Sequence, residues 1–131
     1  MAVNLLLVDD SATVRSIIAK TMRMAGIDIG ELHEASNGKE ALGVLKDHWI
    51  DLVLTDINMP EMNGVEFIER MSQDDLLKSI PVVVVSTEGS ATRVEELISK
   101  GVRAYVRKPF TPEKLREVVD TVLGTSDERQ S

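Results

Sequence analysis

Short apolar runs of strand length alternate along this chain with stretches whose apolar residues repeat at helical spacing. The runs around residues 4–8, 52–55 and 82–85 are unbroken, which predicts strands that are buried on both faces of a sheet. The segments 31–35 and 103–106 are more polar and are predicted to form the edge strands. This alternation predicts an α/β fold, with a parallel sheet and helices on both sides.

Five helical patterns follow the five predicted strands. The longest consists of Val14, Ile17, Ile18, Thr21, Met22 and Ala25, which form one stripe of an amphipathic helix. The others are Ala41-Leu42-Leu45, Val65-Ile68-Met71, Val94-Leu97-Ile98 and Leu115-Val118-Val119-Val122-Leu123. Ligands of such sheets bind outside the carboxyl ends of the strands, so the residues at those ends are the candidates for function.

Length and composition narrow the class of protein further. The 131 residues suit one domain, predicted to span 1–124, with a short polar and disordered tail at 125–131. The sequence contains no cysteine, which excludes disulfides, thiol chemistry and a cysteine-ligated zinc site. No apolar stretch approaches the roughly 20 residues of a membrane span. A formal charge of −7 argues against binding to nucleic acid. We therefore expect a cytoplasmic domain with no membrane or nucleic-acid partner.

Three acidic residues follow two of the buried runs. Asp9 and Asp10 end the first run, and Asp56 ends the run at 52–55. The pair Asp9-Asp10 alone is equally compatible with capping of the next helix. Three converging carboxylates, however, repel one another unless they are protonated or bind a cation. Oxygen ligands of this kind suit Mg²⁺ or Mn²⁺, and a carboxylate left open beside such a cation can attack phosphorus.

The two remaining strand ends carry a hydroxyl and an ammonium group. Ser86 ends the run at 82–85, and Lys108 follows the segment 103–106. A lysine can neutralise phosphoryl oxygens and a small hydroxyl can hydrogen-bond one of them. Either residue alone is typical of an ordinary turn or surface position. Their joint placement with the acids predicts a site that handles phosphate.

These residues resemble the receiver domain of two-component response regulators, over essentially residues 4–123. The matching elements are Leu-Val-Asp-Asp at 7–10, Thr-Asp-Ile-Asn-Met-Pro at 55–60, Gly64, Pro-Val-Val-Val-Val-Ser at 81–86 and Lys-Pro-Phe at 108–110. The likeness is strongest to stand-alone CheY-like chemotaxis regulators. It implies a flavodoxin-like, doubly wound sheet of five parallel strands in the order 2-1-3-4-5, with five helices.

The resemblance also implies a role for each candidate residue. The metal ligands it implies for Mg²⁺, with Mn²⁺ as a substitute, are Asp10, Asp56, the backbone carbonyl of Asn58 and, mainly through water, Asp9. Asp56 would also be the phosphoacceptor. Lys108 would pair with a phosphoryl oxygen, and the Lys108–Pro109 peptide bond would be cis.

Further residues would convert phosphorylation into a signal. Ser86 and Tyr105 would form the switch, with Ser86 moving to bond the phosphate and Tyr105 turning inward. The residues that would tune water access and phosphoryl lifetime are Asn58, Thr87 and Glu88. Tyr105 is also compatible with an ordinary residue of an edge strand.

The implied function is that of a single-domain response regulator. It would accept a phosphoryl group from a histidine kinase or histidine phosphotransfer protein, with weak self-phosphorylation and self-dephosphorylation. The fourth helix, fifth strand and fifth helix would bind a downstream protein. The domain would be a monomer, with a dimer as the alternative when phosphorylated. We expect the kinase to contact Arg15 and Ile18, Trp49 to serve packing, and His33 and His48 to be incidental.

Three other functions fit parts of the pattern. A pseudo-receiver that binds partners without phosphorylation would be expected to have lost an acid or the lysine. A phosphohydrolase with an aspartyl nucleophile would space its first acids as Asp-x-Asp, whereas Asp9 and Asp10 are adjacent. A flavodoxin-like nucleotide binder would need a glycine-rich loop after the first strand. The phosphorylation switch is therefore preferred.

Overall fold

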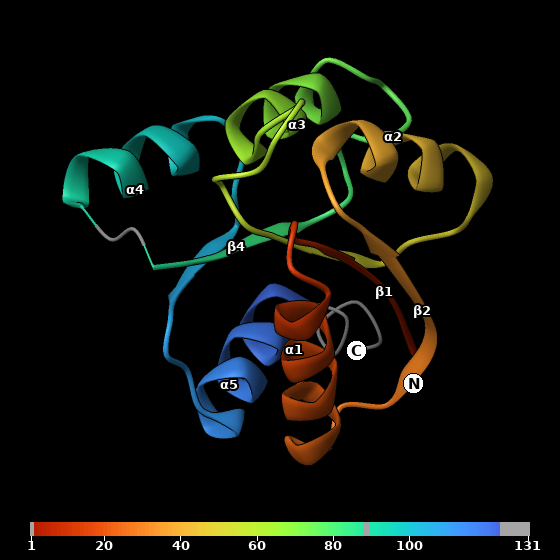
Figure 1. The fold of residues 1–131 in the computed structure, drawn as a ribbon, viewed down its shortest axis with the longest axis vertical. Coiled ribbons are helices and arrows are strands. Elements are labelled where there is room, and N and C mark those ends of the chain that lie inside the picture. The colour runs from red at the N-terminus through yellow and green to blue at the C-terminus, as the bar shows by residue number, and fades with distance from the viewer. Residues whose placement is uncertain (1, 88–89, 124–131) are drawn as a thin grey trace, which may run out of the picture.

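The computed structural model describes residues 2–87 and 90–123, and within these ranges five strands alternate with five helices (Figure 1). The elements are β1 (Val3–Val8), α1 (Ala12–Met24), β2 (Ile29–Ala35), α2 (Gly38–Asp47), β3 (Leu52–Thr55), α3 (Gly64–Ser72), β4 (Val82–Ser86), α4 (Ala91–Ser99), β5 (Ala104–Arg107) and α5 (Pro112–Leu123). The predicted domain end at 124 and the predicted tail at 125–131 lie outside the described residues.

The five strands form one parallel sheet in the order β2-β1-β3-β4-β5. Helices α1 and α5 cover one face of this sheet, and α2, α3 and α4 cover the other (Figure 1). The predicted fold class, strand order and edge strands are confirmed. The order reverses between β1 and β3, because β2 lies on one side of β1 and β3 on the other. The carboxyl ends of these two strands are therefore the expected place for a ligand.

The unbroken apolar run of β1 supplies both layers of the core. Leu5 and Leu7 pack in the cluster that contains the buried residues of α1 and α5. Leu6 and Val8 pack in the cluster on the opposite face, beneath α2 and α3. Successive side chains of a strand point to opposite faces, so a strand covered on both sides must be apolar at every position. This is why β1, β3 and β4 lack the alternation of a half-exposed strand.

Side-chain caps fix the start of all five helices. The caps are Ser11, Asn37, Asn63, Ser90 and Thr111, each of which accepts a hydrogen bond from a backbone N–H in the first turn. At α2 the Glu40 carboxylate also accepts from the Ser36 N–H at 3.1 Å and the Ser36 hydroxyl at 2.8 Å. The backbone hydrogen bond from Ser36, and then its hydroxyl, lower the pKa of Glu40. The cap at Ser11 starts α1 directly after the two predicted acids.

Two predictions about single side chains are wrong. Ile18 was expected to be a surface residue that a kinase contacts, but it is 3% exposed and packs in the core between α1 and the sheet, whereas its neighbour Ile17 is half exposed. The apolar stripe in the sequence includes both Ile17 and Ile18, but only Ile18 is covered by the sheet. Trp49 was expected to serve packing, but it is 78% exposed and its Nε1–H donates to Asp51 Oδ1 at 2.9 Å. Among the described residues, no helix is long and apolar enough to cross a bilayer.

Candidate functional site

The first acid of the site is fixed by the end of β1. The Asp9 N–H donates to the Ala35 carbonyl at 3.1 Å, which continues the pairing of β1 with β2. Its side chain turns toward the start of α1, where Oδ1 accepts from the Ser11 N–H at 2.9 Å. Asp9 is only 2% exposed. Burying a carboxylate is costly unless it is hydrogen-bonded or paired with a positive charge, so its second oxygen needs a partner.

The second acid lies beside the first because β3 is the neighbour of β1. The Asp56 N–H donates to the Val8 carbonyl at 2.9 Å, so Asp56 follows directly on the paired part of the two strands. Its Oδ1 accepts from the Ile57 N–H at 2.6 Å. The Asp56 side chain is 15% exposed, so this carboxylate, unlike that of Asp9, keeps a path to solvent.

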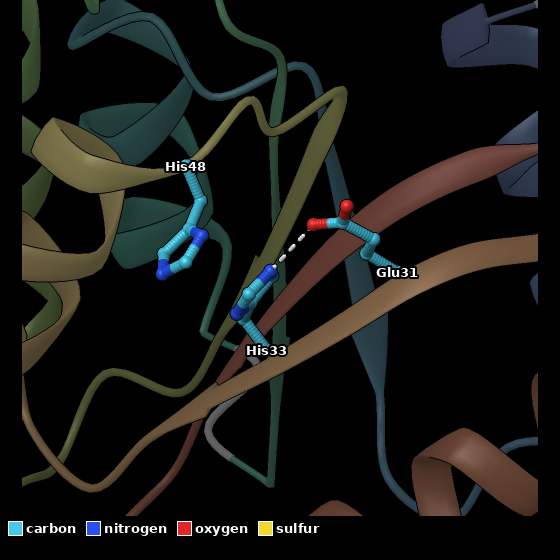
Figure 2. A group of neighbouring side chains, drawn as sticks. All are labelled: Glu31, His33 and His48. Atoms are coloured by element: carbon cyan, nitrogen blue, oxygen red, sulfur yellow. Dashed lines mark hydrogen bonds and ion pairs between the residues drawn. The ribbon is translucent and has the colours of Figure 1, made fainter.

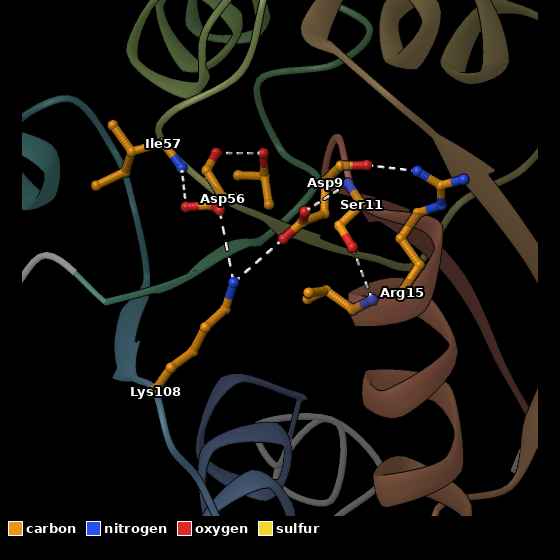
Figure 3. Close-up of polar contacts among 8 residues, drawn as sticks. Asp9, Ser11, Arg15, Asp56, Ile57 and Lys108 are labelled. Atoms are coloured by element: carbon orange, nitrogen blue, oxygen red, sulfur yellow. Dashed lines mark hydrogen bonds and ion pairs between the residues drawn. The ribbon is translucent and has the colours of Figure 1, made fainter.

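Lys108 supplies the partner of both carboxylates. Its N–H donates to the Ser86 carbonyl at 2.9 Å, which fixes the chain at the end of β5. Its ammonium Nζ then lies 3.2 Å from Asp9 Oδ2 and 3.5 Å from Asp56 Oδ2 (Figure 3). The Lys108–Pro109 bond is cis, as predicted. Residues from three different strand ends thus meet at one edge of the sheet.

The other predicted residues lie around this core of the site. Asp10 and Asn58 are exposed. Ser86 is the buried last residue of β4, and Thr87 after it is exposed. Tyr105 is on β5 in register with Val84, and it packs with a buried hydroxyl against the core on the α4 side of the sheet. Glu88 lies outside the described residues.

Two supporting residues were not assigned this role from the sequence. Arg15 donates from Nη1 to the Asp9 carbonyl, and its Nε lies 2.9 Å from Glu34 Oε1, so it ties the end of β1 to the edge strand. Gly64 begins α3 directly against the phosphoacceptor candidate, because a Cβ built there would lie 2.2 Å from the Asp56 carbonyl oxygen. Gly64 was visible in the motif, whereas nothing in the sequence distinguishes Arg15 from a surface arginine.

The donor chemistry of this edge fits Mg²⁺. Asp9 and Asp56 meet at the Lys108 ammonium, whereas the side-chain oxygens of Asp9, Asp10 and Asp56 do not all lie within 4.8 Å of one another. Together with Asp10, which follows Asp9 and is exposed, the acids and the lysine carry a formal charge of −2, which favours a divalent cation. All the candidate ligand atoms are oxygens, the type that Mg²⁺ prefers, and Mg²⁺ usually keeps several waters. The exposure of Asp10 and the partial exposure of Asp56 leave room for those waters. The residues that would hold the ion are Asp10, Asp56, the Asn58 carbonyl and, through water, Asp9.

The model of the response regulator receiver domain family matches residues 5–120, which is most of the chain. This chain belongs to that family. The chemotaxis protein CheY1 of Helicobacter pylori is 42% identical over 124 residues, covering 94% of this chain and 98% of that protein. The CheY homologue of Campylobacter jejuni is 41% identical and covers 92% of both chains.

Solved structures agree with this assignment. The chemotaxis response regulator CheY4 of Vibrio cholerae superimposes with a TM-score of 0.82 at 32% identity, covering 94% of this chain and all of that one. A CheY of Borrelia burgdorferi, solved as a CheX-CheY-BeF3-Mg²⁺ complex, gives 0.82 at 29% identity and covers 92% of this chain and 89% of that one. The chain is thus a CheY-like receiver domain, consistent with a response regulator of chemotaxis signalling.

Membership of the receiver family fixes the broad class of function. Receivers of two-component systems are signalling switches rather than classical enzymes, and phosphorylation and Mg²⁺ are typical of them. They interact with histidine kinases and with downstream partners.

Proposed function

We propose that this receiver accepts a phosphoryl group on Asp56 and thereby changes its affinity for a downstream protein. The observation that carries the proposal is the meeting of Asp9, Asp56 and the Lys108 ammonium at the carboxyl edge of the sheet. Of the two carboxylates that contact the ammonium, that of Asp56 is the more exposed. It is therefore the one that a phosphodonor reaches more easily.

In the transfer step, an Asp56 carboxylate oxygen attacks phosphorus. A P–O bond to that oxygen forms while the P–N bond of a phosphohistidine donor breaks, and the electron pair of that bond leaves with the imidazole nitrogen. The Ile57 N–H holds Asp56 Oδ1 in place. The Lys108 ammonium, 3.5 Å from Oδ2, is positioned to pair with a phosphoryl oxygen. Bound Mg²⁺ would neutralise phosphoryl charge and orient the reacting oxygens, and Mn²⁺ would substitute for it.

The phosphoryl group then acts through Ser86 and Tyr105. Ser86 is the last residue of β4, and its carbonyl accepts a hydrogen bond from the Lys108 N–H. The Ser86 hydroxyl therefore lies at the same edge of the sheet as the lysine. A new dianion at Asp56 would draw the Ser86 hydroxyl toward it and stabilise one of two packings. Tyr105 lies on the next strand, with its ring on the α4 side. Its hydroxyl is already buried, and phosphorylation would favour this inward packing behind Ser86.

The output surface would consist of α4, β5 and α5. Exposed residues available on it include Glu95, Ile98 and Lys114. The phosphodonor would be a histidine kinase or histidine phosphotransfer protein, and the domain would be a monomer that can dimerise when phosphorylated. Asn58 and Glu88, which follow Asp56 and Ser86 by two residues in the sequence, would set the lifetime of the acyl phosphate, and Thr87 would tune access of the phosphodonor.

Intact mass spectrometry after incubation with acetyl phosphate or phosphoramidate tests the proposal. The expected result is a gain of one phosphoryl group that needs Mg²⁺, decays with time and is absent in Asp56→Asn. Labelling that persists in Asp56→Asn would sink the assignment. No gain with either donor would favour the pseudo-receiver, and Thr87→Ala separates that outcome from hindrance by the exposed Thr87 side chain.

A further inference from the structure

Two histidines and a glutamate meet at the edge of the sheet, in a cluster separate from the acidic site. Glu31 and His33 are two residues apart on the edge strand β2, so their side chains leave the same face. His33 is in register with Leu6, which packs in the core beneath α2. His48 is the C-cap residue of that helix. The three side chains therefore meet where the end of α2 passes over β2 (Figure 2).

The ligand atoms of this cluster are close together. One nitrogen or oxygen from each of the three residues lies within 4.8 Å of the other two, and among the described residues this is the one such group of histidine and acidic side chains. His33 Nε2 lies 2.9 Å from Glu31 Oε1. The rings of His33 and His48 are stacked, with centroids 4.0 Å apart and planes at 30°. Both histidines of the sequence are in this cluster.

We propose that Glu31, His33 and His48 bind a divalent transition-metal ion of the Zn²⁺ class. The hydrogen bond between Glu31 and His33 would form without His48, because both residues lie on β2. His48 comes from a different element, the end of α2, and brings a second imidazole to the same place. Two imidazole nitrogens and one carboxylate oxygen are a ligand set that Zn²⁺ takes, with its fourth position open to water. Mg²⁺ prefers oxygen ligands throughout, so the two sites of the molecule select different ions.

Binding requires a small rearrangement that the cluster allows. Zinc lies about 2.0–2.2 Å from each ligand atom, so the ion must replace the hydrogen bond between His33 Nε2 and Glu31 Oε1. The two stacked rings must also turn until a nitrogen of each faces the ion. His48 and Glu31 are exposed, and His48 follows the helix rather than lying within it. Their side chains can therefore turn toward His33 without disturbing the core. The bound ion would tie the edge strand β2 to the end of α2 and stabilise the folded chain.

Titration with Zn²⁺ in the presence of excess Mg²⁺, which occupies the acidic site, tests this proposal. Competition with a chromophoric chelator gives the affinity of wild type and of the variants His33→Gln, His48→Ala and Glu31→Gln. The matched control is Asp47→Asn, which removes an exposed acid next to His48. We expect one equivalent of Zn²⁺, affinity reduced about tenfold or more in each histidine variant and less in Glu31→Gln, and no change in the control. Zn²⁺ should also raise the melting temperature of wild type but not of His48→Ala.

Two results would overturn the proposal. The first is wild-type protein that binds Zn²⁺ no more tightly than the double variant His33→Gln/His48→Ala. The second is Zn²⁺ binding that survives in this double variant but is lost in Asp56→Asn, because the ion would then occupy the acidic site. Circular dichroism of each variant without metal establishes that a loss of binding is not a loss of fold.

Discussion

Replacing Gly64 with alanine should displace Asp56, the phosphoacceptor that we propose, because α3 begins in direct contact with the backbone of that residue. The Gly64 N–H donates to the Ile57 carbonyl at 2.7 Å, which holds the two segments together. A Cβ at Gly64 would lie 2.2 Å from the Asp56 carbonyl oxygen and 2.8 Å from Ile57 Cα. Real Cβ atoms stay beyond 3.0 Å from such neighbours, so the two backbones must separate by about 0.8 Å. Neither obstacle is a side chain that could turn away.

This displacement should affect both stability and phosphorylation. Overpacking of this kind costs about 1–3 kcal/mol of unfolding free energy, and a misplacement near 1 Å can cost on the order of 100-fold in the rate of a positioned reaction. Urea unfolding measures the first effect. The time course of mass gain from acetyl phosphate with Mg²⁺ measures the second, for which we expect a loss of about 10- to 100-fold.

Gly43→Ala is the matched control. The substitution is the same, but Gly43 lies on the exposed side of α2 and a Cβ there meets no heavy atom within 4 Å. Alanine should raise the unfolding free energy by about 0.5–1 kcal/mol at this helical position and leave phosphorylation unchanged. If Gly64→Ala unfolds at the urea midpoint of wild type and is phosphorylated at the wild-type rate, the close approach does not position Asp56.

Three further predictions concern charges and the lone tryptophan. Lys108→Ala should lower the unfolding free energy in the presence of a chelator by about 1–3 kcal/mol, because the nearly buried Asp9 carboxylate loses the ammonium 3.2 Å away; an unchanged urea midpoint would contradict this. Ser36 lowers the pKa of Glu40, so Glu40 should stabilise the fold above its unfolded-state pKa and lose that effect as pH falls through the lowered folded value. Glu40→Gln should therefore be less stable than wild type at neutral pH and equal to it in acid; a difference independent of pH would refute the linkage. Trp49 is exposed and precedes β3, at the opposite end of that strand from the acidic site. Its fluorescence should therefore not change as Mg²⁺ is added. A quench that saturates with Mg²⁺ would refute this placement.

The fold could be predicted because strand and helix patterns alternate without interruption, but the start of β2 could not. β2 begins at Ile29 rather than near residue 31. Gly30 looks like a turn residue in the sequence, yet the Asn4 side chain accepts the Glu31 N–H at 2.9 Å and supports this start of the strand. A shift of register between Val3 and Leu5 accompanies it. This hydrogen bond comes from a side chain on another strand, so the sequence around Gly30 does not indicate it.

The acidic site was predictable to the extent that it depends on residue types at strand ends. Asp9, Asp56 and Lys108 lie in contact as the parallel sheet requires. The donors that orient the two acids are the backbone N–H groups of Ser11 and Ile57, and nearly every residue carries such a group. The histidine cluster was missed for a different reason, because its members meet only when the end of α2 packs over the edge strand.

The two ion pairs of Lys108 span 99 and 52 residues of sequence, and this separation has a consequence for how the chain folds. In a growing chain β1 and β3 are made before β5, so any pairing of these two strands at that point occurs without Lys108. At that stage the carboxylates of Asp9 and Asp56 face one another without their ammonium. Docking of β5 then relieves the repulsion, so the last strand to be synthesised gains stability from the charges it neutralises. Mg²⁺ present during refolding would relieve the same repulsion before β5 docks.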